Sequence, residues 1–107
     1  MKYSVLTGTG LTVSRFCLGT MTFGGQVSEE EGIRILHAAI DRGINFIDTA
    51  NTYTGGASEC ITGKGIKEHR HQLILASKVC NPVNRETAGP NDMGLTRRHI
   101  RASVIDS

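Results

Sequence analysis

Three side chains in the sequence, Asp48, Tyr53 and Lys78, have the types and the spacing to build a proton-donating site. Asp48 directly follows one apolar segment, Lys78 lies two residues after another, and Tyr53 lies five residues after Asp48. A carboxylate buried at the end of a strand is costly unless a cation pairs with it, and Lys78 is such a cation. An ammonium a few ångströms from a phenol also favours phenolate and lowers the pKa of a tyrosine below its usual ~10. The group therefore has the chemistry of a general acid; a structural Asp–Lys pair beside an ordinary loop tyrosine is the alternative.

The apolar segments that must position these side chains recur along the chain. They cover residues 16–19, 44–47 and 73–76, and their first residues are 28 and 29 positions apart. That interval fits one strand followed by one crossover helix, which makes neighbouring strands parallel. Segment 44–47 is expected to be buried on both faces. Because the carboxyl ends of parallel strands meet at one edge of a sheet, we expect the acid, the phenol and the amine to lie together there.

The segments between these strands are expected to be helices. In the first, residues 28–43, Ser28 and Glu31 form a capping box in which Ser28 caps the helix and Glu31 reaches back. Gly43 then supplies a left-handed stop. The second helix is expected to begin with Ser58 as its cap and to run to about residue 69.

A third helix is expected to start at Thr96, with Leu95 and Ile100 forming a hydrophobic staple. The Pro-, Gly- and Asn-rich segment 79–95 before it is long enough to be a functional loop. Residues 3–16 alternate around two glycines and predict a β-hairpin. The order is that of a single α/β domain over residues 1–107, either the start of an α/β barrel or a small open sheet.

Composition excludes several classes of function. The chain has 107 residues, a net charge of +2 and no run of Lys and Arg, so nucleic-acid binding is not expected. No segment approaches 18 apolar residues and no signal peptide is present, which predicts a cytoplasmic protein without membrane attachment. Gly8 and Gly10 lead into a strand and lack the third glycine of a dinucleotide fingerprint, and segment 19–25 lacks the Lys-Ser/Thr of a P-loop.

The cysteines and histidines point to neither metal nor disulfide chemistry. The three cysteines are far apart and form no CxxC pair, so we expect reduced thiols that are buried or half-buried. The four histidines are expected to have solvated or capping roles. These residues are Cys17, Cys60, Cys80, His37, His69, His71 and His99.

The residues singled out above resemble those of a known family, the aldo-keto reductases, over essentially the whole chain. The matching motifs are TGLTVS at 9–14, LGTMTFGG at 18–25, GINFIDTA at 43–50 with Tyr53, GGASE at 55–59, ASKV at 76–79 and GLTRRHI at 94–100. The resemblance implies a (β/α)8 barrel, of which this chain would hold the N-terminal hairpin and about three βα units. A complete barrel needs ~250 residues, so the chain is expected to be truncated.

The resemblance also implies roles for individual residues in reducing a small-molecule carbonyl with NADP(H), or less commonly NAD(H). Tyr53 would donate the proton, Lys78 would lower the tyrosine pKa, and Asp48 would pair with Lys78. Gly19, Thr20 and Met21, together with Asp48, would lie near the nicotinamide ribose of the cofactor. No metal is implied.

The departures from the family pattern carry their own expectations. The family's fourth catalytic residue, a histidine ending the fourth strand, would lie beyond Ser107. Cys60 and Thr62 replace a Glu and an apolar residue, and Thr62 should weaken packing of the second helix. Alone, the chain is expected to be inactive, to bind NADPH negligibly and to be marginally stable or self-associated through exposed sheet edges. A non-catalytic module resembling potassium-channel β subunits and a functionless fragment remain alternatives.

Overall fold

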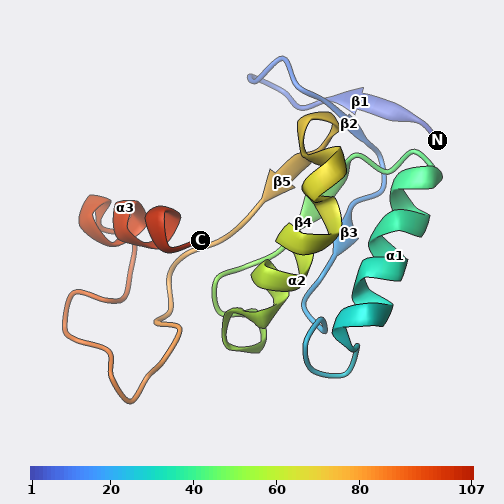
Figure 1. The fold of residues 1–107 in the computed structure, drawn as a ribbon. Helices are drawn as coiled ribbons and strands as arrows, with labels where there is room; N and C mark the ends of the chain where they lie inside the picture. The colour runs from blue at the N-terminus through green and yellow to red at the C-terminus, as the bar shows by residue number, and fades with distance from the viewer.

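The computed structural model describes residues 1–107 as a mixed α/β structure with two sheets (Figure 1). The elements are β1 (Tyr3–Val5), β2 (Thr12–Ser14), β3 (Leu18–Gly19), α1 (Glu29–Asp41), β4 (Phe46–Asp48), η1 (Tyr53–Gly56), α2 (Ala57–Ile66), η2 (Lys67–Gln72), β5 (Ile74–Ala76) and α3 (Arg97–Asp106). β1 and β2 form the predicted antiparallel hairpin. β3, β4 and β5 form a parallel sheet in that order, which confirms the predicted strand–helix repeat.

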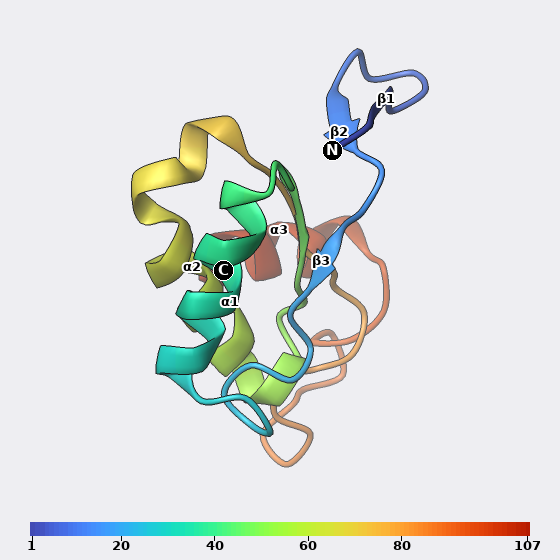
Figure 2. The same ribbon diagram turned by 90° about the vertical axis from the view of Figure 1, so that its right-hand side faces the viewer.

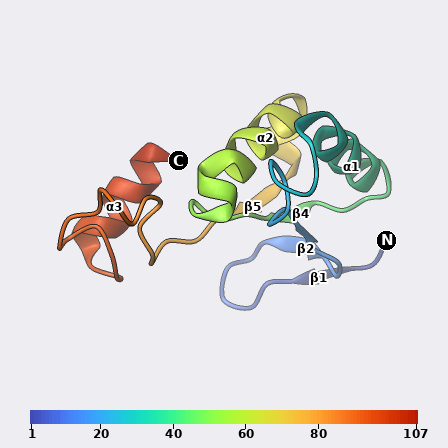
Figure 3. The same cartoon turned by 90° about the horizontal axis from the view of Figure 1, so that it is seen from below.

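The hydrophobic core lies between the parallel sheet and helices α1 and α2, which pack side by side over the same face (Figure 3). It is built from Phe23, Leu36, Ile47, Ile61, Ile66 and Leu73. The opposite face of the sheet carries no helix. α3 stands apart from this body at the end of the long loop that follows β5 (Figures 1 and 3) and lies behind α1 in the view of Figure 2, so its apolar side chains Val104 and Ile105 are 70% and 79% exposed. None of the helices has the length and apolar character needed to span a bilayer.

The start of α1 confirms half of the predicted capping box. The Ser28 hydroxyl accepts a hydrogen bond from the Glu31 backbone N–H at 3.3 Å, as an N-cap should. The Glu31 carboxylate does not reach back, because both its oxygens pair with Arg34 at 2.7 and 2.8 Å. Gly43 has the predicted left-handed conformation, with φ of 86°.

The predicted start of the second helix is wrong. α2 begins at Ala57 after a left-handed Gly56, and Ser58 lies inside its first turn with no exposed surface. The regular helix ends at Ile66 rather than near residue 69, and a 3-10 segment follows it to Gln72. A glycine already turns the chain into the helix, so the Ser58 side chain is free to make contacts elsewhere.

The exposure of several other side chains also differs from expectation. All three cysteines are exposed, so the predicted burial of their thiols is wrong. Thr96 caps α3 as predicted, accepting from the His99 backbone N–H at 3.2 Å. Leu95 nevertheless remains 67% exposed, so the expected staple with Ile100 covers little of it. Because α3 is remote from the hydrophobic core, no core surface is available to cover Leu95.

Thr62 offers a direct test of the expected weakness of α2. Its side chain is 1% exposed and its hydroxyl has no hydrogen-bond partner. Valine has the same shape without the hydroxyl, and a buried unsatisfied polar group costs roughly 1–3 kcal/mol. We therefore expect Thr62→Val to raise the free energy of unfolding by about 1 kcal/mol, measured by urea denaturation. A loss of stability would show that the hydroxyl has a partner in solution.

Candidate active site at the ends of the parallel strands

Asp48, Tyr53 and Lys78 converge on one ammonium group, and we call them the triad. The Lys78 Nζ lies 2.6 Å from Asp48 Oδ2 and 2.9 Å from the Tyr53 hydroxyl oxygen. Its third hydrogen bond goes to the Thr49 carbonyl at 3.0 Å. An ammonium has three N–H donors, so all of them are used. The phenol oxygen accepts from Lys78, which leaves the phenol's own hydrogen available to another acceptor.

The parallel sheet explains why residues 25 and 30 positions apart meet. Asp48 is the last residue of β4 and pairs in register with Ala76, the last residue of β5. Lys78 lies two residues beyond that strand end. Tyr53 begins η1, where Thr54, Gly55 and Gly56 all have positive φ and reverse the chain into α2.

Asp48 is less buried than the sequence led us to expect. Its side chain is 32% exposed and that of Lys78 is 49% exposed. Of strand β4, only Ile47 on the helix-covered face is fully buried, because no element covers the other face. The charge pair is therefore half in water, and it makes a weaker contribution to stability than a buried pair would.

The ionisation of Lys78 reflects these contacts. Partial burial lowers the pKa of Lys78, but the hydrogen bonds to Asp48 and then Tyr53, together with their negative charge when ionised, outweigh it and hold the pKa above its ordinary 10.5. Lys78 is therefore an ammonium at neutral pH. Cys17 is close enough to be affected by the pair. Although the residue is exposed, partial desolvation of its thiol first, and then the Asp48 charge, raise the pKa of that thiol, with Lys78 acting in the opposite direction.

The raised pKa of Lys78 predicts a pH dependence of stability. A cation whose pKa is raised on folding stabilises fully below its unfolded pKa, ordinarily 10.5, and this contribution is lost as pH rises through the higher folded value. We expect the difference in unfolding free energy between the wild type and Lys78→Met to be constant from pH 7 to about 10 and to shrink above that. Urea denaturation across this range measures it. A difference that shrinks between pH 7 and 9 would contradict the assignment.

The three residues expected to approach a cofactor differ in their exposure to solvent. Gly19 is exposed, and a Cβ built on it would meet nothing within 4 Å. Met21 is 63% exposed. Thr20, by contrast, is fully buried, and its hydroxyl lies 2.8 Å from Ser58 Oγ and 3.1 Å from the Asp48 carbonyl. Its side chain is therefore directed into the protein and away from the open face.

Sequence reasoning missed the buried hydroxyls beneath the triad. Ser58 Oγ donates to the Thr20 carbonyl at 2.7 Å and lies 3.0 Å from the Thr49 hydroxyl. A signal was present in the sequence, because a hydroxyl residue directly follows the last residue of each parallel strand. These residues are Thr20, Thr49 and Ser77.

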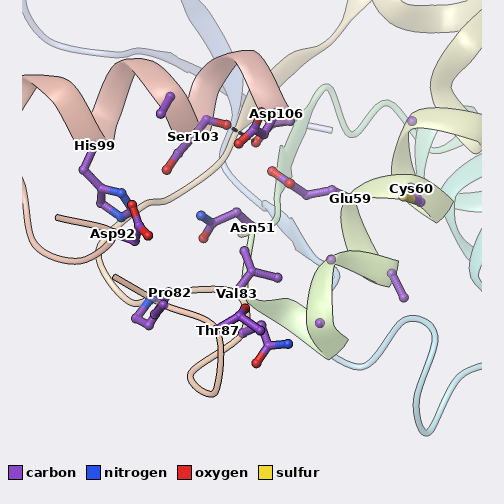
Figure 4. A pocket seen from close by; sticks show the side chains of 18 of the residues that line it. Asn51, Glu59, Cys60, Pro82, Val83, Thr87, Asp92, His99, Ser103 and Asp106 are labelled. Carbon is purple, nitrogen blue, oxygen red and sulfur yellow. Dashed lines mark hydrogen bonds between the residues drawn. The ribbon is translucent and has the colours of Figure 1, made fainter. Parts of the chain in front are cut away.

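A cavity on another part of the molecule does not contain the triad. It has a volume of about 950 Å³ and lies between α2, the loop 82–92 and α3 (Figure 4). The His99 imidazole points into it from α3, is 7% exposed and has no partner for Nε2. The solvated or capping role expected for the His99 side chain is therefore wrong. No group of three or more His, Cys, Asp or Glu side chains is placed to hold a metal ion.

Comparison with known proteins places the segment that contains these strand-end residues in a protein family. The sequence profile of the Aldo/keto reductase family matches residues 15–107, a span that includes the whole triad. The chain belongs to the aldo/keto reductase family. This confirms the resemblance inferred from the sequence motifs.

Individual family members match over nearly the whole of this chain. The Uncharacterized oxidoreductase YrpG of Bacillus subtilis is 44% identical over 97% of the chain and 36% of its own length. A probable voltage-gated potassium channel subunit beta of Arabidopsis thaliana is 38% identical over 94% of the chain and 30% of its own length. The solved aldo-keto reductase AKR11C1 from Bacillus halodurans, in its holo form, superimposes with a TM-score of 0.83 at 31% identity.

These matches also define how much of a family member is present. AKR11C1 aligns with 99% of this chain, and the aligned part makes up 35% of AKR11C1. The chain therefore spans about a third of the length of the relatives it matches.

Proposed function

We propose that this chain contributes the proton-donating part of an NAD(P)H-dependent reductase that converts aldehydes or ketones to alcohols. The observation that carries the proposal is the single ammonium of Lys78 in contact with both the Asp48 carboxylate and the Tyr53 phenol. In this proposal, the hairpin and the three strand–helix units are the N-terminal part of a (β/α)8 barrel, and family members about three times longer than this chain represent the complete form.

In the proposed reaction, Tyr53 transfers its phenol proton to the carbonyl oxygen of the substrate as negative charge develops there. Lys78 stabilises the phenolate that remains, because its ammonium already donates a hydrogen bond to the same oxygen. Asp48 holds the ammonium at the phenol and balances its charge. The three residues thus divide the work of donating, tuning and positioning.

The open face beside the triad fits a nicotinamide cofactor. Gly19 leaves space that a side chain would fill, and Asp48 pairs in register with it across β3 and β4. We propose that Gly19, Thr20 and Met21 approach the cofactor, with Thr20 acting from beneath through its buried hydroxyl. When bound, NADP(H), or less commonly NAD(H), supplies the hydride that the carbonyl carbon receives. AKR11C1 from Bacillus halodurans was solved in a holo form, which supports a bound cofactor in the family.

A chimera tests this proposal in a complete protein. Residues 1–107 would replace the segment they match in AKR11C1 from Bacillus halodurans, and NADPH consumption would be followed with a panel of aldehydes and ketones. We expect turnover by the chimera and none by the 107-residue chain alone, which lacks most of a barrel and leaves apolar sheet edges free to self-associate. A folded chimera that turns over no carbonyl, beside active AKR11C1, would reject the proposal.

A non-catalytic role is the second candidate, favoured by the 38% identity to the plant potassium-channel subunit beta. In that role the barrel would bind a nicotinamide cofactor and a protein partner, and the triad would be structural. The two candidates differ in one measurable respect. Only the enzyme loses its turnover when the Tyr53 hydroxyl is removed.

A further inference from the structure

Two consecutive residues of helix α2, Ser58 and Glu59, contact the segments that follow all three parallel strands. The Ser58 hydroxyl binds Thr20, which follows β3, and Thr49, which follows β4, at 2.7–3.0 Å. The Glu59 carboxylate accepts a hydrogen bond from the Ser77 hydroxyl, which follows β5, at 2.5 Å. One turn of one helix therefore connects the three strand ends on which the triad is built.

The hydrogen bonds at Ser58 largely fix which hydroxyl donates and which accepts. Ser58, Thr20 and Thr49 are 0–2% exposed and share three hydroxyl hydrogens. The Ser58 hydrogen goes to the Thr20 carbonyl, and Ser58 Oγ can accept from Thr49. The Thr20 hydrogen is divided between Ser58 Oγ and the Asp48 carbonyl. A buried network with all its members paired rigidifies the backbone that it joins.

That backbone carries the Asp48 side chain and the Thr49 carbonyl, the two groups of residues 48 and 49 that accept hydrogen bonds from Lys78. The Thr20 N–H and hydroxyl both bind the Asp48 carbonyl, at 3.0 and 3.1 Å. Lys78 in turn donates to the Asp48 carboxylate and to the Thr49 carbonyl. On the other side, Ser77 is the residue directly before Lys78, and Glu59 holds it. Movement of either strand end would change the distance between the ammonium and its acceptors.

We propose that Ser58 and Glu59 act as a brace that positions the Lys78 ammonium against Asp48 and Tyr53. Neither brace residue hydrogen-bonds to a triad side chain, so they are positioning residues that act through Thr20, Thr49 and Ser77. The value of this brace for catalysis rests on the reductase function proposed above. Its effect on the geometry of Lys78 does not, and it can be measured without any turnover.

The test measures Lys78 ionisation in the 107-residue chain itself, by NMR titration of ¹⁵N-labelled lysine side chains. Lys78 is one of only four lysines, and Lys64, paired with Glu29 at 2.7 Å, serves as an internal reference. We expect Ser58→Ala and Ser77→Ala each to shift the Lys78 pKa downward by more than the scatter of Lys64, because the ammonium loses part of its contact with Asp48. Ser77→Ala removes the Glu59 link without removing a charge.

Thr62→Val is the matched control. It removes a buried hydroxyl from the same helix, but one without a partner, so it should leave the Lys78 pKa unchanged. Far-UV circular dichroism establishes that each variant is folded, and Thr49→Val replaces Ser58→Ala if the latter does not fold. An unchanged Lys78 pKa in a folded Ser58→Ala variant, or in Thr49→Val read in its place, overturns the proposal.

The chimera then separates this proposal from the proposed function. If the chimera is active, Ser58→Ala should lower kcat more than it changes KM, because substrate contacts remain while the proton donor is misplaced. If the chimera is inactive and the Lys78 shift is nevertheless seen, the brace stands and the reductase function fails. If the chimera is active but Lys78 does not shift, the brace fails alone.

Discussion

Tyr53→Phe lowers kcat of the chimera for carbonyl reduction by about 10²–10⁴-fold, the usual contribution of a positioned general acid. The substitution removes the phenol hydroxyl, which lies 2.9 Å from Lys78 Nζ, and leaves the ring in place. Because the ring still fills its site, substrate and cofactor binding should change far less than turnover. Steady-state kinetics with NADPH and a saturating aldehyde measure the effect.

The chain contains its own control for this experiment, since it has only two tyrosines. Tyr3→Phe removes the other phenol hydroxyl, which donates to the Gly43 carbonyl at 2.8 Å in the hairpin region. It should leave kcat within about twofold, because it touches no strand end of the parallel sheet. Equal loss of activity in both variants would indicate damage to the fold, and full activity of Tyr53→Phe would remove the proton-donor role.

Gly24→Ala destabilises the chain by about 2–5 kcal/mol, from two separable causes. Gly24 has φ of 81°, in the region that costs an L-residue about 1–2 kcal/mol. A Cβ at this position would also lie 2.6 Å from the Ala57 Cβ at the start of α2, so the loop after β3 and the helix would have to separate. Overpacking of this kind adds about 1–3 kcal/mol.

Gly8→Ala isolates the first cause. Gly8 has nearly the same φ, 79°, but a Cβ there would meet nothing within 4 Å. We expect it to cost about 1–2 kcal/mol, so the excess for Gly24→Ala reports the clash with Ala57. Urea denaturation of both variants gives this difference. Equal losses would mean that the loop and α2 separate freely in solution.

Local spacing in the sequence determined much of the architecture. The strand–helix interval predicted that β3, β4 and β5 are parallel, and the meeting of parallel strand ends at one edge predicted that Asp48, Tyr53 and Lys78 lie together. Signals that act over three or four residues, such as the Ser28 and Thr96 caps, were also confirmed. The caps depend on residues close in the sequence, and the strand–helix interval depends on the regular geometry of strands and helices. Both can be read directly from the sequence.

Tertiary structure decided where the remaining polar side chains point. Ser58 satisfies the local pattern of a helix cap, yet its hydroxyl binds Thr20, 38 residues away in the sequence, because a glycine already turns the chain and the strand ends lie against the helix. Burial of His99 and exposure of the cysteines were likewise set by which elements cover them. Contacts of this kind depend on which distant segments the fold brings together. The spacing of apolar segments along the sequence therefore specifies the strand ends. Only the packed structure shows which side chains hold those strand ends in place.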